Sequence, residues 1–363
     1  MAVNQTLDQT APHTADTVIR VEPGQSVQEA LDRGGPGATV QLAEGVHSGN
    51  VVIAHPGVTL RGAGAGRTVL VPGPVAPSAV PPLHDAPPDV VSGIVVHGAD
   101  TDTAGGIGEV AVEGLTVRGF SGAGVYAHTV NGLRLHDVEA VDNTIWGLYV
   151  RESSDIEVSR CRGEGSRYAG IALAFCSRAD AVVADNECVG NAFGVFVDNS
   201  SFARVLRNRC HGNAAGMLLL NQVYPGEPEG GVRDCLVADN DVHDNTLAAG
   251  GDDPEALGAA GPPISGVGIA LIGTERVSLV NNRVHGNQPG GFSLMPAAVV
   301  IDSSAEWGGS DAVDNSLEWN TITGNSPLDV RISVDVTRQR LANNVVGVSE
   351  PDSVSGRAAE GTQ

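Results

Sequence analysis

Side chains that transfer protons or recognise rings recur in this chain at fixed distances after a glycine. Four of them follow a glycine by four residues: His97, His128, Arg151 and Asp198. Three follow a glycine by two residues: Tyr126, Tyr149 and Phe196. A Tyr or His takes or returns a proton, and an Arg stabilises the enolate or carboxylate that develops when a C–H bond breaks. The set predicts non-hydrolytic acid–base catalysis by His128, Tyr149, Arg151 and Asp198.

The glycines themselves mark a repeat. A glycine followed by a four-residue β-run recurs at Gly124, Gly147, Gly170, Gly194 and Gly216, with steps of 23, 23, 24 and 22 residues. The first and third residues of each run are apolar, so we expect them to face the interior and the second and fourth to face outward. Stacked coils lie about 4.8 Å apart, so the outward residues form one strip. Substrate binding is expected from the strip positions His97, Tyr126, Phe196, Leu218, Leu220, Ala270, Ile272 and Asp302.

A second repeat, out of phase with the first, consists of paired asparagines five residues apart. The pairs are Asn186/Asn191, Asn208/Asn213, Asn240/Asn245, Asn282/Asn287 and Asn320/Asn325. Asn tolerates left-handed backbone and can bond to its own column in the next coil, which suits the corners of parallel coils. A coil of this length cannot bury its apolar side alone, so stacked coils must form the core.

The N-terminal segment predicts a short capping helix. Ser26 is a candidate N-cap, Glu29 follows three residues later, and Gly34-Gly35 ends the pattern. Over residues 17–347 the chain resembles the right-handed parallel β-helix proteins of the pectate-lyase-like superfamily. The resemblance implies an all-β solenoid with an N-terminal capping helix and loop insertions over one sheet. We expect one domain at 17–347, a flexible segment at 1–16 and a flexible C-terminal tail at 348–363.

The outer strip is too apolar for a solvated surface in its later coils. Leu218, Leu220, Ala270 and Ile272 stand where Ser, Thr or charged residues are expected. Either loops wall a cleft above the sheet, or they pack on it as a second small core. The candidate covering segments are 73–92, 98–110, 224–228, 246–267, 288–297 and 303–314.

Composition excludes several classes of partner. All 21 basic residues are arginine, so lysine Schiff-base chemistry is impossible. The net charge of −22 argues against nucleic acid and anionic membranes, and makes a polyanionic substrate less favourable. No signal peptide or membrane span is recognisable, which predicts a cytoplasmic protein. We expect a small-molecule substrate and no cofactor.

Cysteines and histidines also stack in register. Cys161, Cys188 and Cys210 are expected in one inward column as free thiols. His211, His243 and His285 share an outward register, where a polar ladder is favoured over a metal site. Asp252-Asp253 with Glu255 offers calcium ligands, although a solvated acidic loop is favoured there. No metal is predicted.

The predicted function is an isomerase, cyclase or lyase acting on a small to medium-sized, partly apolar substrate, such as a polyketide-like natural-product intermediate. Two-carboxylate hydrolysis is disfavoured because Asp198 and Asp302 belong to distant strands, and the motifs of polygalacturonases, pectin methylesterases and mannuronan epimerases are absent. One alternative is a uronate lyase or epimerase acting on a poly- or oligosaccharide, with Tyr126, Tyr149 and Phe196 stacked on sugar rings. The other is a non-catalytic binding scaffold.

Overall fold

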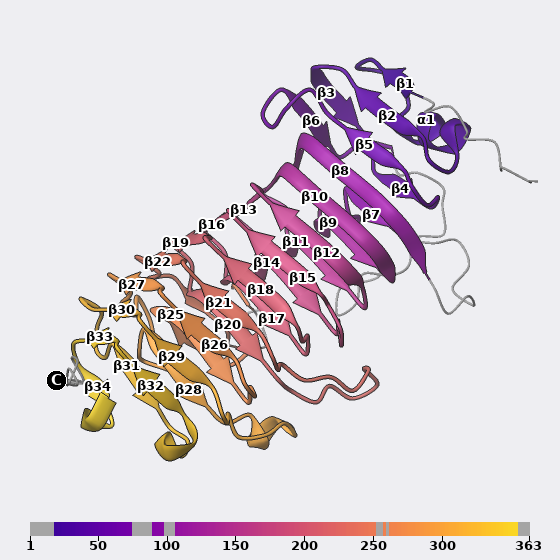
Figure 1. The fold of residues 1–363 in the computed structure, drawn as a ribbon. Coiled ribbons are helices and arrows are strands. Elements are labelled where there is room, and N and C mark those ends of the chain that lie inside the picture. The colour runs from indigo at the N-terminus through magenta and orange to yellow at the C-terminus, as the bar shows by residue number, and fades with distance from the viewer. Residues whose placement is uncertain (1–17, 75–88, 98–105, 252–256, 259–260, 355–363) are drawn as a thin grey trace, which may run out of the picture.

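The computed structural model describes residues 18–74, 89–97, 106–251, 257–258 and 261–354. Its strands wind coil after coil into an elongated solenoid, from the indigo N-terminal end to the yellow C-terminal end (Figure 1). Every pairing in the two large sheets, of 21 and 11 strands, is parallel. The expected parallel β-helix is confirmed.

Each complete coil contributes one strand to each of three faces. The first face contains β1 (Val18–Val21), β2 (Thr39–Leu42), β5 (Thr59–Arg61), β12 (Ser154–Ser159), β15 (Ala181–Ala184), β18 (Ala203–Leu206), β21 (Leu236–Ala238), β26 (Ser278–Val280), β29 (Ser316–Glu318) and β32 (Arg340–Ala342). The second contains β3 (Gly45–Ser48), β6 (Thr68–Val71), β13 (Arg162–Glu164), β16 (Glu187–Val189), β19 (Arg209–His211), β22 (Asp241–His243), β27 (Arg283–His285), β30 (Thr321–Ile322) and β33 (Val345–Val346). The long strands β8 (Ile107–Arg118) and β10 (Val130–Val141) run through both faces and join them into the larger sheet.

The third face is the 11-stranded sheet of glycine-containing repeats. Its strands are β4 (Val51–Ile53), β7 (Ile94–Val96), β9 (Ala123–His128), β11 (Trp146–Arg151), β14 (Ala169–Ala174), β17 (Phe193–Asp198), β20 (Ala215–Leu220), β25 (Val267–Ile272), β28 (Val299–Asp302), β31 (Val330–Ile332) and β34 (Ser349–Glu350). Tyr149 is in register with Tyr126 on one side and Ala172 on the other. Arg151 is likewise in register with His128 and Ala174, so the predicted strip exists, with two positions per coil.

The glycine of each repeat interrupts the alternation of side chains. Between β9 and β11, Trp146 pairs with Ala123, and the next residues in register are Leu148 and Val125, after the glycine of each strand. A Cβ at Gly147 would collide with the carbonyl oxygen of Gly170 in the next coil, so only glycine fits. Strict alternation would place Trp146 and Tyr149 on opposite faces, yet both line the same outer cavity. Each glycine therefore directs the residue before it outward.

Two columns of buried asparagine hold the corners together. The Asn186 backbone N–H donates to Asn208 Oδ1 at 3.0 Å, and that of Asn191 donates to Asn213 Oδ1 at 3.0 Å. The pattern repeats through successive coils to Asn344 and Asp329. Each side-chain amide also donates to a backbone carbonyl, which satisfies polar groups inside the solenoid. The asparagine prediction is confirmed.

The N-terminal cap is the expected helix, α1 (Val27–Gly34). Ser26 Oγ accepts a hydrogen bond from the Glu29 N–H at 3.2 Å, and Gly35 ends the helix with a φ of 69°. Val27, Ala30 and Leu31 are buried in the interior core, so the helix closes the first coil.

The C-terminal boundary differs from the prediction. Residues 348–354 were expected in a flexible tail, but β34 pairs with β31 and the short helix η3 (Asp352–Val354) buries Val354 in the core. The sequence Ser349-Glu350 continues the strand register by one more coil, and this is why the domain extends to at least residue 354. Residues 1–17 and 355–363 lie outside the described structure.

All five cysteines are buried and free. Cys188 is in register with Cys210, as expected, but Gly163 rather than Cys161 is in register with Cys188. The Cys161 N–H donates to Asn186 Oδ1 at 2.8 Å. Cys161, two residues before Gly163, therefore occupies a position in the asparagine column. The prediction that all three cysteines lie in one column was therefore wrong.

Three short elements complete the fold: an antiparallel pair of β23 (Ala248–Ala249) and β24 (Ile264–Ser265), and the helices η1 (Ala305–Trp307) and η2 (Val336–Arg338). Among the described helices, none has the length and apolar character needed to span a membrane.

Candidate functional site

The outer side of the 11-stranded sheet is covered by inserted segments. Leu218, Ala270 and Ile272 belong to a second apolar cluster outside the coils, together with Ala249 and Ile264 of the covering segment 246–267. The Gly258 N–H donates to the Arg167 carbonyl at 2.6 Å, which ties this segment to the beginning of β14. The expected cover is confirmed, and it forms both a second core and a cleft. Residues 252–256 and 259–260 of this segment lie outside the described structure, as do 75–88 and 98–105 of the predicted covering segments 73–92 and 98–110.

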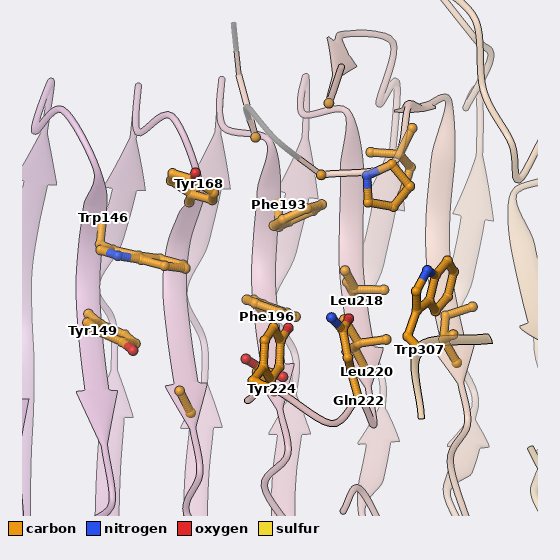
Figure 2. A pocket seen from close by; sticks show the side chains of 18 of the residues that line it. Trp146, Tyr149, Tyr168, Phe193, Phe196, Leu218, Leu220, Gln222, Tyr224 and Trp307 are labelled. Atoms are coloured by element: carbon orange, nitrogen blue, oxygen red, sulfur yellow. The ribbon is translucent and has the colours of Figure 1, made fainter. Parts of the chain in front are cut away.

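The cover leaves a cavity of about 390 Å³ above β11, β14, β17, β20 and β25. Six of the predicted catalytic and binding residues line it: Tyr149, Phe196, Asp198, Leu218, Leu220 and Ile272. The other lining groups come from strand ends and four of the insertions: Ile145, Trp146, Tyr168, Ala174, Phe175, Phe193, Gln222, Tyr224, Gly250, Gly258, Gly261, Pro262, Ile264, Met295 and Trp307. Figure 2 shows the aromatic side chains gathered around this space.

Two alanines of β14 provide the room on the sheet. Ala172 stands in register between Tyr149 and Phe196, and Ala174 stands between Arg151 and Asp198. Each methyl group projects far less than its neighbours, so the outer surface of the sheet is lowered between β11 and β17. The sequence contained this signal as the pair Ala172/Ala174 within a strip of large residues.

An aromatic wall closes one side of the cavity. The Trp146 ring stacks on Tyr149 with centroids 4.7 Å apart, and on Tyr168 at 5.1 Å (Figure 2). Phe193 and Phe196 continue the wall with centroids 5.2 Å apart. Trp146 and Phe193 both precede the glycine of their repeat. Sequence analysis missed them because it considered only the four residues after each glycine.

The polar groups of the cavity are few. Asp198 is only 6% exposed, and Tyr149 is only 4% exposed. Burial raises the pKa of Tyr149 well above its usual range, against an opposing effect of the Arg151 charge, and the carboxylate of Asp198 adds to the increase. Tyr149 therefore keeps its proton and can act as a hydrogen-bond donor. Gln222 and Tyr224 line the same space.

Arg151 lies beside the cavity and not in its lining. Its Nε donates to Glu152 Oε1 at 2.9 Å, and its Nη2 donates to Glu227 Oε2. The guanidinium also lies over the Phe175 ring, 4.6 Å from its centroid. Because Arg151 and Glu227 have side chains only 5% and 4% exposed, this is a buried ion pair that anchors the 221–235 loop. Arg151 adjoins the cavity through the lining residues Phe175 and Tyr149, and its predicted stabilisation of an enolate stays a prediction.

The remaining aromatic part of the strip forms a stack next to the cavity. His97 and His128 have ring centroids 5.4 Å apart, Tyr126 and His128 6.0 Å, and Tyr126 and Tyr149 5.5 Å. His128 Nε2 lies 3.4 Å from Glu152 Oε1. Burial raises the pKa of Tyr126 to about 12, and burial with the nearby His128 lowers the pKa of His97. The structure brings these residues together, but His97, Tyr126 and His128 do not line the cavity.

Two further strip positions do not reach the cavity either. Ala270 is buried beneath the cover, and Asp302 accepts a hydrogen bond from the Ser303 N–H at 2.8 Å. The catalytic and binding roles of all these residues stay predictions.

The histidine ladder is a surface feature of the second face. His211, His243 and His285 stack with centroids 5.1 Å apart, and Glu187, Asp241 and Asp244 are their carboxylate partners. Among the described residues, no cluster of three His, Cys, Asp or Glu side chains is arranged to hold a metal ion. The candidate calcium ligands Asp252, Asp253 and Glu255 lie outside the described residues.

Comparison with known proteins identifies the family of this chain. The family model for the right handed beta helix region matches residues 92–347. The chain therefore belongs to the right-handed β-helix family. No curated protein sequence matches this β-helix protein.

Solved structures of the same fold include alginate-modifying enzymes. The A-module of the Azotobacter vinelandii mannuronan C-5 epimerase AlgE4 superposes with a TM-score of 0.66 at 21% identity, covering 89% of this chain and 91% of that one. The alginate lyase from Paenibacillus sp. str. FPU-7 gives 0.53 at 15% identity, covering 95% and 98%. The Dettilon tailspike protein gives 0.52 at 12% identity, covering 91% and 60%. At these identities the likeness establishes the fold of the β-helix protein.

Proposed function

We propose that the protein is a non-hydrolytic acid–base enzyme, a lyase or an isomerase, that breaks a C–H bond next to a carbonyl group of a ring compound. The observation that carries this proposal is the presence of Tyr149 and Asp198 in the lining of one cavity whose other walls are mainly aromatic and aliphatic. A buried carboxylate and a protonated hydroxyl in an apolar site are suited to proton transfer with stabilisation of the resulting oxyanion.

The two groups take complementary roles. Asp198 accepts the proton as the C–H electron pair moves toward the carbonyl, and the charge develops on the carbonyl oxygen. Tyr149 donates a hydrogen bond to that oxygen, since its raised pKa keeps it protonated. Return of the proton to another carbon, or to the opposite face of the same carbon, gives an isomerase. Loss of a leaving group from the adjacent carbon gives a lyase.

The aromatic wall supplies binding and excludes water. Trp146, Tyr168 and Phe196 offer flat faces against which a ring can lie, and their burial lowers the local dielectric. Hydrogen bonds and charges act more strongly in such a site than in water. A small to medium-sized, partly apolar ring compound fits this lining best.

A uronate lyase or epimerase is the second candidate. The shared fold of a mannuronan C-5 epimerase and an alginate lyase supports it over a natural-product cyclase. Stacking of sugar rings on Trp146 or Phe196 would also be compatible with the cavity.

Incubation with mannuronate and galacturonate oligomers separates the two candidates. Unsaturated products in the ultraviolet, or inversion at a ring carbon by NMR, would establish the uronate candidate. We expect neither product, and we expect a bicyclic ketone to exchange its acidic protons instead. Absence of turnover and exchange with every ring carbonyl tested would favour a non-catalytic scaffold.

A further inference from the structure

The cavity is long and narrow. Its lining runs over the sheet from Tyr149 on β11 to Ile272 on β25, across β14, β17 and β20. Neighbouring strands lie about 4.8 Å apart, so the lining extends roughly 19 Å along the axis of the solenoid. A volume of about 390 Å³ spread over this length forms a channel. The shape suits an elongated ligand.

The end of the channel over β11 and β14 is aromatic. The planes of Trp146 and Tyr149 are 12° apart, and those of Trp146 and Tyr168 are 26° apart. Nearly parallel faces of this kind bind a flat ring by stacking. Trp146 is 8% exposed and Tyr149 is 4% exposed, so a ring that lies against them is withdrawn from water.

The end of the channel over β20 and β25 is aliphatic. Its described lining includes the side chains of Leu218, Leu220, Ile264, Ile272 and Met295. Branched side chains without flat faces, together with an adaptable methionine, pack well against a flexible hydrocarbon chain.

The aliphatic end reaches the surface of the protein at Trp307. This residue lies beside Leu218 and Leu220, far from Trp146 (Figure 2), and it is 37% exposed. Its backbone carbonyl accepts a hydrogen bond from the Val223 N–H at 3.2 Å, which ties it to the 221–235 loop. A ligand that enters here passes the aliphatic end before it reaches the aromatic end.

From this division of the lining we infer that the cavity takes a ring compound that carries an aliphatic chain. The ring lies deep in the channel, against Trp146 and Tyr149. The chain runs back over Leu220 toward Trp307. This inference rests on the proposed function, because it names the substrate class of the same cavity.

The physical basis is the transfer of methylene groups out of water. Each methylene buried against apolar walls tightens binding by roughly fourfold. A polar chain of the same length, such as further sugar units, would lose hydrogen bonds to water and regain few. Among the described lining residues at this end, polar side-chain groups come from Gln222 and the indole of Trp307.

Binding of a matched series of ligands tests the inference without any turnover. The series consists of the bicyclic ketone tetralone and its ethyl, butyl and hexyl derivatives, with the chain on the aromatic ring. Isothermal titration calorimetry gives the dissociation constant of each. We expect affinity to rise along the series by roughly fourfold for each buried methylene, and hexyltetralone to bind at least about 100-fold more tightly than tetralone.

Two variants test which end holds the chain. Leu220→Gln should remove most of the gain along the series and leave the affinity for tetralone unchanged. Phe193→Leu, at the aromatic wall, should weaken all four ligands by a similar factor. Leu236→Gln is the matched control. Leu236 is also a partly buried strand leucine, but it lies on β21 of the first face, outside the lining, so its replacement should change nothing.

Affinity that does not rise with chain length in the wild type would overturn the inference whatever the variants do. A gain that survives in Leu220→Gln as it does in Leu236→Gln would overturn it too, as would loss of the gain in Phe193→Leu alone. If affinity rises as expected but no ring ketone exchanges protons, the inference stands and the proposed catalysis fails. Proton exchange without any dependence of binding on chain length has the opposite meaning.

Discussion

At the scale of single residues, the strip divides into groups that reach the cavity and groups that support it. Tyr149 and Arg151 lie two residues apart on β11 and face the same side. Tyr149 lines the cavity, whereas the Arg151 guanidinium is paired with Glu227 of the 221–235 loop. Two side chains on the same side of one strand can therefore have different roles, because the inserted loops determine which of them stays accessible.

The lowered pKa of His97 predicts a measurable loss of stability in mild acid. Burial and the neighbouring His128 hold the pKa of His97 below its ordinary value, so the unfolded chain binds this proton more tightly than the folded chain. The free energy of unfolding should thus fall as the pH drops through about 6.5. Replacement by Gln removes this contribution.

Urea unfolding of wild type and His97→Gln at about pH 8 and about pH 5.5 measures the effect. We expect a smaller loss of stability on acidification in the variant. An equal or larger loss would show that His97 is not responsible.

At the scale of elements, the buried ion pair between β11 and the 221–235 loop positions one wall of the cavity. Arg151 contacts Glu227 and Phe175, and the Phe175 ring packs edge-on against Tyr224 with centroids 5.8 Å apart. Phe175 and Tyr224 both line the cavity. Arg151 is thus a positioning residue for the wall that faces Asp198.

Arg151→Met should cost roughly 3–5 kcal/mol of unfolding free energy, because it leaves Glu227 buried without its cation. Arg160→Met is the matched control, since Arg160 pairs with Asp137 at 2.8 Å on the exposed surface. That substitution should have no measurable effect on unfolding. Similar losses in the two variants would contradict the assignment of a buried anchor.

Glu227→Gln should loosen the loop while the coils stay folded. Hydrogen exchange of residues 221–235 should become faster, because the loop loses its charged partner for Arg151. Glu229→Gln, an exposed change in the same loop, serves as the control. Unchanged exchange in Glu227→Gln would show that Arg151 does not position this wall.

The elements were predictable wherever the repeat is regular. Glycine spacing, alternation and paired asparagines predicted the coil register, and Ser26 with Gly35 marked the cap. Trp146 was missed because its glycine interrupts the alternation. Glu227 was missed because it lies 76 residues from Arg151 and outside the repeat, where no periodicity indicates which coil a loop returns to.

At the scale of the whole molecule, stacked coils bury every thiol. Burial raises the pKa of Cys161 to about 12, and that of Cys176 and Cys235 to about 11. Because the thiolate is the reactive form, all five cysteines should resist alkylation in the folded protein. Mass spectrometry after iodoacetamide treatment should show almost no labelling in buffer and five labels in denaturant. Rapid native labelling of Cys161 would contradict the observed stacking.

The solenoid also explains how one molecule combines a rigid base with a variable cover. Asparagine columns and the apolar interior hold β11, β14 and β17 at fixed spacing, and the insertions above them form the cavity walls. The same fold carries the epimerase and lyase chemistry named for its structural neighbours. Function is therefore determined by the residues of the strip and its cover.

Solvent-deuterium exchange into the bicyclic ketone tetralone tests the central claim most directly, since it measures C–H breakage whatever the natural product is. Followed by proton NMR, the α-protons should exchange faster with wild-type protein than with buffer. Asp198→Asn should abolish the enhancement, and Tyr149→Phe should lower it by roughly 10²–10³-fold. Asp137→Asn, which changes an exposed carboxylate of the larger sheet, is the control and should leave it intact. A wild-type exchange rate equal to that of Asp198→Asn would contradict the account.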